Sequence, residues 1–161
     1  MAQVTETVQP LFLEDLHIGQ QFISGPYVME ESRIKAFAAE FDPQPFHLDE
    51  SAAQASMFRG LAASGWHTAA VVMRLLVTGG LPFAGGLVGL GGELAWPRPT
   101  RPGDTLRVES QIVGISPSRS KPDQGIVTVQ STTFNQNREP VYRFTAKILA
   151  FRRAVEPDPA R

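Results

Sequence analysis

The chain of 161 residues carries 15 basic and 16 acidic side chains, for a formal net charge of -1, and 42% of its residues are hydrophobic. These values fit one globular domain with its own core, and near-neutrality gives no indication of a nucleic-acid partner. The sequence has no cysteine, which excludes disulfides, thiolate metal sites and a cysteine nucleophile, and favours a cytoplasmic protein. Residues 1–20 lack the pattern of a secretory signal, so we expect a mature N-terminus.

The first predicted elements are a strand and an amphipathic helix. A turn at 17–19, which contains His17, precedes an extended segment at 21–29. Apolar residues then recur at i, i+3, i+4 and i+7, which predicts a helix over 30–41. The apolar residues of this helix are Ile34, Phe37, Ala38 and Phe41.

Two prolines interrupt the chain after this helix. Asp42 follows its last turn, and the prolines within 42–47 fix φ and lack an N–H, so we predict a stiff loop there. A minor helix capped by Asp49 or Ser51 is expected next, ending near Gly60.

The segment 66–77 is apolar at nearly every position, which is typical of a helix buried on almost all sides. The wider apolar region 61–96 contains His67, Arg74 and Glu93. These polar side chains exclude a membrane span, so we expect no membrane partner.

The second half of the chain predicts antiparallel strands at 87–96, 105–112, 125–135 and 141–151, the first two half-buried and the last two joined by a hairpin. The order of strand, helices and strands predicts an α+β domain in which a long curved antiparallel sheet wraps around a buried central helix. We expect a single domain over 1–161 with a core of about 13–153, a flexible N-terminal leader and a loose tail at 156–161.

Asp42 and His47 form the first candidate for chemistry. A histidine titrates near neutral pH, and the proline-stiffened loop allows its side chain to converge with the carboxylate on one substrate atom. The alternative is that Asp42 only terminates a helix and His47 only fills a loop position. Spacing alone favours this alternative.

Ser64 and Gly65 form the second candidate, because Gly65 stands at the expected start of the buried helix. Unpaired N–H groups and the helix dipole at that point can stabilise a developing oxyanion, and Ser64 can add a hydroxyl. The alternative is a helix cap with close packing.

The stretch FAAEFDPQPFHLDESAAQASMFRGLAASGWHTAAVVMRLL resembles the hydratase motif of the MaoC-like dehydratases, which include the (R)-specific enoyl-CoA hydratases. A weaker resemblance continues through WPRPTRPGDTLRV and NQNREPVYRFTAKILAFRR, from about residue 13 to 153. It implies a hot-dog fold, a homodimer or higher homo-oligomer, and a thioester tunnel near the subunit interface. It also implies that Asp42 and His47 are catalytic, and that Ser64 and Gly65 supply the oxyanion contact.

The chemistry implied by this resemblance is hydration or dehydration of an enoyl-CoA thioester, with coenzyme A as part of the substrate and no metal or other cofactor. The chain departs from the motif at two positions. Gln44 replaces the usual Asn between the catalytic pair, and Ser64 stands where His is frequent. Gln44 retains an amide on a longer stem.

Other residues are weaker candidates. The candidates for the substrate pocket are Gln44, His67, Trp66, Phe83 and Trp96. For the histidine and the aromatic residues, the alternative is an ordinary core or interface position. Basic loop residues are candidates for binding the phosphates of coenzyme A, although exposed charges are usually only solvated. These basic residues are Arg98, Arg101, Arg119 and Lys121.

Two other functions are compatible with these residues. A hot-dog domain can host a thioesterase, since a fold does not determine its function. A noncatalytic acyl-CoA-binding subunit is the other alternative, and Gln44 and Ser64 give it some support.

Overall fold

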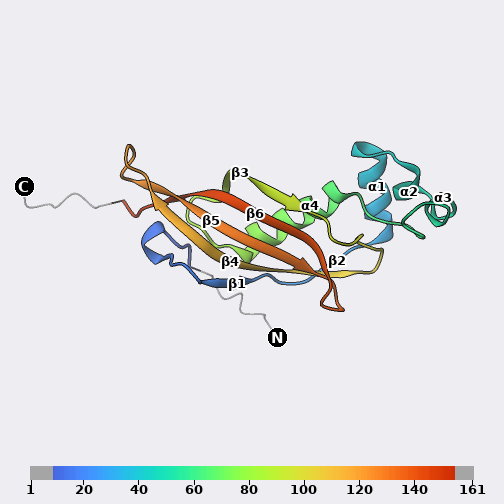
Figure 1. Cartoon of the computed structure of the whole chain (residues 1–161), viewed down its shortest axis with the longest axis horizontal. Helices are drawn as coiled ribbons and strands as arrows, with labels where there is room; N and C mark the ends of the chain where they lie inside the picture. The colour runs from blue at the N-terminus through green and yellow to red at the C-terminus, as the bar shows by residue number, and fades with distance from the viewer. Residues whose placement is uncertain (1–8, 155–161) are drawn as a thin grey trace, which may run out of the picture.

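A computed structural model describes residues 9–154 of the chain, and its elements follow the predicted order of strands, helices and strands (Figure 1). The helices are α1 (Glu31–Phe41), α2 (Pro45–Leu48), α3 (Glu50–Gln54) and α4 (Gly65–Leu75), with a 3-10 turn η1 (Leu13–Asp15) and a π turn η2 (Leu76–Gly80). The strands are β1 (Gln21–Ile23), β2 (Tyr27–Val28), β3 (Val88–Ala95), β4 (Thr105–Pro117), β5 (Gln124–Phe134) and β6 (Pro140–Phe151).

The strands form one antiparallel sheet in the order β1-β4-β5-β6-β3, with β2 also paired to β4. The long helix α4 runs along this sheet, whereas α1, α2 and α3 cluster beyond one of its ends (Figure 1). Alternate residues of β4, among them Leu106, Val108 and Ile112, are buried with Val72 of α4 in a single core. The prediction of an α+β domain with a sheet wrapped around a helix is confirmed.

The predicted strand 21–29 is interrupted and forms β1 and β2. Ser24 ends β1, and its hydroxyl accepts a hydrogen bond from the Val108 N–H at 2.9 Å, in the place of a main-chain carbonyl. Gly25 and Pro26 follow, and a proline has no N–H to continue the pairing with β4.

The loop predicted at 42–47 is partly helical, so that prediction is wrong in part. Pro45 occupies the first turn of α2, where its fixed φ suits a helix and its missing N–H has no intrahelical partner to lose. Asp42 caps the end of α1 as expected, but Phe41, predicted to face the core, is 64% exposed. The next helix, α3, is capped by Asp49, whose side chain accepts from the Ala52 N–H at 2.7 Å, and it ends earlier than predicted.

Two predictions about burial are wrong for the single chain. The central helix was expected to be buried on almost all sides, and the strand predicted at 87–96 was expected to be half-buried. One face of α4 is exposed, and β3 is exposed along its whole length. The exposed apolar residues are Trp66, Met73 and Val77, which lie on or just after α4, and Val88, Leu90 and Leu94 of β3. Within residues 9–154, β3 pairs only with β6, so it forms an edge of the described sheet.

The chain ends are partly described. Leu11, within the expected leader, forms a parallel bridge with Phe83, while residues 1–8 and the predicted tail 156–161 lie outside the described residues. No helix within residues 9–154 has the length and apolar character needed to cross a membrane.

Candidate active site

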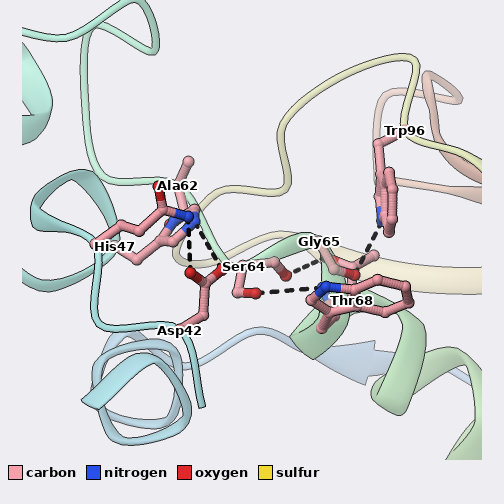
Figure 2. Close-up of polar contacts among 9 residues, drawn as sticks. Asp42, His47, Ala62, Ser64, Gly65, Thr68 and Trp96 are labelled. Atoms are coloured by element: carbon pink, nitrogen blue, oxygen red, sulfur yellow. Dashed lines mark hydrogen bonds and ion pairs between the residues drawn. The ribbon is translucent and has the colours of Figure 1, made fainter. Parts of the chain in front are cut away.

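Asp42 and His47 lie side by side at the junction of α1 and α2. The Nε2 atom of His47 is 3.3 Å from the Oδ2 atom of Asp42, and the two side chains are 6% and 18% exposed. Asp42 directly follows α1 and His47 is the third residue of the short helix α2, so the break between the two helices brings their side chains together (Figure 2).

The second ring nitrogen of His47 identifies its tautomer. Nδ1 lies 2.6 Å from the carbonyl oxygen of Ala62. A carbonyl can only accept a hydrogen bond, so Nδ1 carries a proton and donates it. Nε2 is therefore the nitrogen that is free to exchange a proton with Asp42 or a substrate.

Both oxygens of the Asp42 carboxylate have polar partners, His47 at Oδ2 and Gln44 at Oδ1. Its Oδ1 atom accepts a hydrogen bond from the Gln44 Nε2 amide at 2.7 Å. Burial acts to raise the pKa of Asp42, but hydrogen bonds from Ser64 and Gln44 and the proximity of His47 outweigh burial, and the pKa lies below its ordinary value of 3.8. Asp42 is therefore a carboxylate at neutral pH.

Ser64 and Gly65 begin α4 directly beside this pair (Figure 2). The Ser64 hydroxyl accepts a hydrogen bond from the Trp66 N–H at 3.3 Å, which makes Ser64 the cap of the helix. Gly65 follows as the first residue of the helix, and no described residue accepts a hydrogen bond from its N–H. This N–H is therefore available to a ligand oxygen.

Asp42, His47 and Gly65 line one cavity of about 490 Å³, whereas Ser64 is fully buried and is not part of its lining. Its polar residues include Asp42, Gln44 and His47, and Gly65 lies in its wall. Most of the remaining lining is apolar or aromatic, and Arg98 is its basic side chain apart from the histidine. The remaining lining residues are Phe46, Met57, Phe58, Ala63, Trp66, Thr68, Trp96, Pro97, Pro99 and Thr100.

A cavity of this kind, with a few convergent polar groups in an apolar wall, is typical of a small-molecule site. The sequence profile described as the MaoC like domain matches residues 15–135. This chain belongs to the MaoC-like domain family.

Relatives of this MaoC-like chain agree with its fold. The protein YdeM of Bacillus subtilis, described as uncharacterized, is 32% identical over 140 residues, which are 85% of this chain and 96% of that protein. The crystal structure of a MaoC-like dehydratase from Rhodospirillum rubrum is 62% identical with a TM-score of 0.89, covering 90% of this chain and 99% of that one. The unliganded R-hydratase PhaJ1 of Pseudomonas aeruginosa is 26% identical with a TM-score of 0.73, covering 94% and 96%. The predicted hot-dog fold is confirmed.

The other candidate residues are placed in different parts of the MaoC-like domain. Trp66 and Trp96 line the cavity. His67, a candidate for the pocket, lies outside the cavity lining, as the alternative of a core position predicted. It is 7% exposed and stacks on Phe37 of α1 with ring centroids 4.8 Å apart. Phe83 belongs to the core and packs edge-on against Phe22.

The basic residues considered for phosphate binding lie in different places. Arg98 lines the cavity, whereas Arg101 is a structural clamp whose guanidinium donates to the carbonyls of Phe58, Gly60 and Leu61 at 2.5, 2.8 and 3.2 Å. Arg119 and Lys121 line a separate depression at the turn between β4 and β5. His17 lies at the turn beside β1, as predicted. Within residues 9–154, no group of three or more acidic or histidine side chains is arranged to hold a metal ion.

Some contributors to the site were not identified from the sequence. The Ala62 carbonyl orients His47, and the segment that carries it is fixed by Thr100, whose carbonyl accepts from the Ala63 N–H at 2.9 Å. The Thr100 hydroxyl also accepts from that of Thr68 on α4 at 3.1 Å. A main-chain carbonyl has no sequence signature, and the bond between Thr68 and Thr100 joins positions 32 residues apart, so no signal in the sequence indicated these supports.

Proposed function

We propose that this protein is an acyl-CoA hydratase or dehydratase that adds water to, or removes it from, the 2,3 double bond of an enoyl-CoA thioester. The observation that carries the proposal is the 3.3 Å contact between His47 Nε2 and Asp42 Oδ2 in the wall of one cavity with Gly65. The hydratase and dehydratase names of the two structural relatives support it.

The tautomer of His47 suits this reaction. Because Nδ1 donates to Ala62, only Nε2 and the Asp42 oxygens face a water molecule placed in the cavity. In hydration, that water loses a proton to the Asp42–His47 pair and its hydroxyl bonds to Cβ, while the pair delivers a proton to Cα. Dehydration reverses these steps.

The Gly65 N–H has the second role. Attack at Cβ moves negative charge onto the thioester carbonyl oxygen, and a fixed N–H donor at that oxygen stabilises the enolate by about 3 kcal/mol. The free N–H at the start of α4 supports placing the thioester carbonyl there. Ser64 supports the site by capping the helix and holding Asp42.

We propose that coenzyme A enters only as part of the substrate and that no metal or other cofactor takes part. Arg98 is the guanidinium at this cavity, and residues 9–154 give it no ion-pair partner. A guanidinium without a counter-ion suits the phosphates of coenzyme A. A cytoplasmic location stays a prediction.

We also propose that the working form is a homodimer. The exposed edge of β3 and the exposed face of α4 form one apolar surface, since Met73 of α4 and Gly89 of β3 line the same small pocket. A second copy would continue the sheet at β3 and cover this surface.

Sedimentation tests this assembly. A Leu90→Lys, Leu94→Lys double variant should sediment as a monomer, because it places charge on the proposed interface. Val113→Lys, at an exposed apolar position of β4, is the matched control and should remain dimeric. A monomeric unmodified protein would contradict the proposal.

Incubation with crotonyl-CoA tests the reaction. Hydration removes the conjugated enoyl absorbance without releasing a thiol, whereas a thioesterase would release free coenzyme A. Binding without either change would indicate a noncatalytic acyl-CoA-binding subunit. A panel of enoyl-CoA substrates differing in length, branching and carboxylation would then define the acyl specificity.

A further inference from the structure

Trp96 forms a hydrogen bond with Gly65, the first residue of α4. It follows the last residue of β3, and its indole Nε1–H donates a hydrogen bond to the carbonyl oxygen of Gly65 at 2.9 Å (Figure 2). The same ring covers the α-carbon of Gly65. A β-carbon built on Gly65 would lie 2.7 Å from Cε2 of Trp96, far inside van der Waals contact.

This hydrogen bond fixes the orientation of one peptide group. The Gly65 carbonyl and the Trp66 N–H belong to the same planar peptide and point in opposite directions. With the carbonyl held by Trp96, the N–H points to the Ser64 hydroxyl, which accepts from it at 3.3 Å. This peptide directly follows the one that carries the Gly65 N–H, and it is held at both ends.

The indole ring is itself supported. It packs edge-on against Trp66 with centroids 5.4 Å apart and lies 6.0 Å from the ring of Tyr142 on β6. Such aromatic contacts restrict the ring, although 40% of Trp96 is exposed to the cavity side and solvent. A restrained donor costs little entropy when it holds a backbone carbonyl.

We propose that Trp96 is a positioning residue, which holds the start of α4 so that the Gly65 N–H keeps the orientation needed by the thioester oxygen. This inference rests on the proposed function for its effect on catalysis. Trp96 acts through Gly65 and takes no part in proton transfer. The edge strand β3 thereby controls the geometry of the oxyanion contact.

Trp96→Phe tests this role, because it keeps an aromatic ring and deletes the donor. We expect kcat for crotonyl-CoA to fall about 10-fold with KM changed less than about twofold, because the donor matters most when charge develops. Tyr142→Phe is the control: it keeps the ring that packs against Trp96 and removes only a hydroxyl at a residue that does not line the cavity. It should leave kcat within about twofold.

An isosteric replacement separates hydrogen bonding from packing. Incorporating 3-benzothienylalanine at position 96 keeps the bicyclic shape without the N–H, and it should reproduce the loss in kcat of Trp96→Phe even if that variant folds poorly. An unchanged kcat, or a rise in KM alone, in the isosteric variant would overturn the proposal.

A spectroscopic measurement separates this inference from the proposed reaction. In the 15N-labelled protein, the amide signals of Gly65 and Trp66 should shift in the position-96 variants and stay unchanged in Tyr142→Phe. Unshifted signals would overturn the positioning role even if the enzyme hydrates crotonyl-CoA. Shifted signals in a protein without hydratase activity would overturn the proposed function and leave the positioning of Gly65 supported.

Discussion

Replacing Gly65 by alanine should damage both stability and turnover, by amounts that follow from its contact with Trp96. The new β-carbon would lie 2.7 Å from Cε2 of the indole, about 1 Å inside an ordinary carbon–carbon contact. Moving the ring by that distance breaks its 2.9 Å hydrogen bond to the Gly65 carbonyl. Overpacking costs about 1–3 kcal/mol and the lost hydrogen bond about 1 kcal/mol, partly offset by up to about 1 kcal/mol from the helix propensity of alanine.

We therefore expect Gly65→Ala to lose about 1–3 kcal/mol of unfolding free energy in urea titration. The same shift displaces the oxyanion donor, so kcat for crotonyl-CoA should fall about 100-fold. Gly25→Ala is the matched control, because its β-carbon meets nothing within 4 Å. Unchanged stability and kcat in Gly65→Ala would refute the contact with Trp96 and the role of the Gly65 N–H together.

Three further substitutions have defined outcomes. Burial and the charge of Arg33 lower the pKa of His67 below its ordinary value of 6.5, so the folded protein loses stability as the pH falls below 6.5. His67→Gln should reduce this loss, measured by urea titration at about pH 7.5 and 5. The same pH dependence in the variant and the unmodified protein would contradict this role of His67. Burial acts to raise the pKa of Asp42, and the hydrogen bond from Ser64 acts to lower the same pKa. Ser64→Ala should therefore move the acidic limb of the kcat/KM profile to higher pH. An acidic limb at the same pH in the variant would contradict this hydrogen bond. Arg101→Met deletes the donors to three loop carbonyls and should lower the free energy of unfolding by about 2–4 kcal/mol in chemical denaturation. Arg119→Met is the control and should cost less than about 0.5 kcal/mol. Equal losses in the two variants would contradict the structural role of Arg101.

Periodicity was enough to predict the long elements of the fold. The alternation of β4 and the apolar spacing of α1 reflect burial of one face, so the sequence carries them directly. The exposure of β3 could not be predicted in this way. An exposed edge strand can be as apolar as a strand packed in the core, and only the arrangement of the sheet distinguishes them.

The site was predictable in its residue types and less so in its supports. The prolines predicted a stiff loop between Asp42 and His47, but Pro45 also suits the first turn of a helix, which that prediction missed. His67 was a pocket candidate because it lies near Gly65 in sequence. On a helix, residues two positions apart face different directions, and His67 faces Phe37.

The most direct test of the proposed reaction is the rate of crotonyl-CoA hydration by Asp42→Asn and His47→Asn, measured beside their binding of the saturated butyryl-CoA. Each variant removes one proton-exchanging group of the 3.3 Å pair. We predict that kcat/KM falls at least about 1000-fold in each variant, while butyryl-CoA binds with a Kd within about threefold of that of the unmodified protein. Hydration at the unmodified rate in either variant would contradict the catalytic assignment of Asp42 and His47.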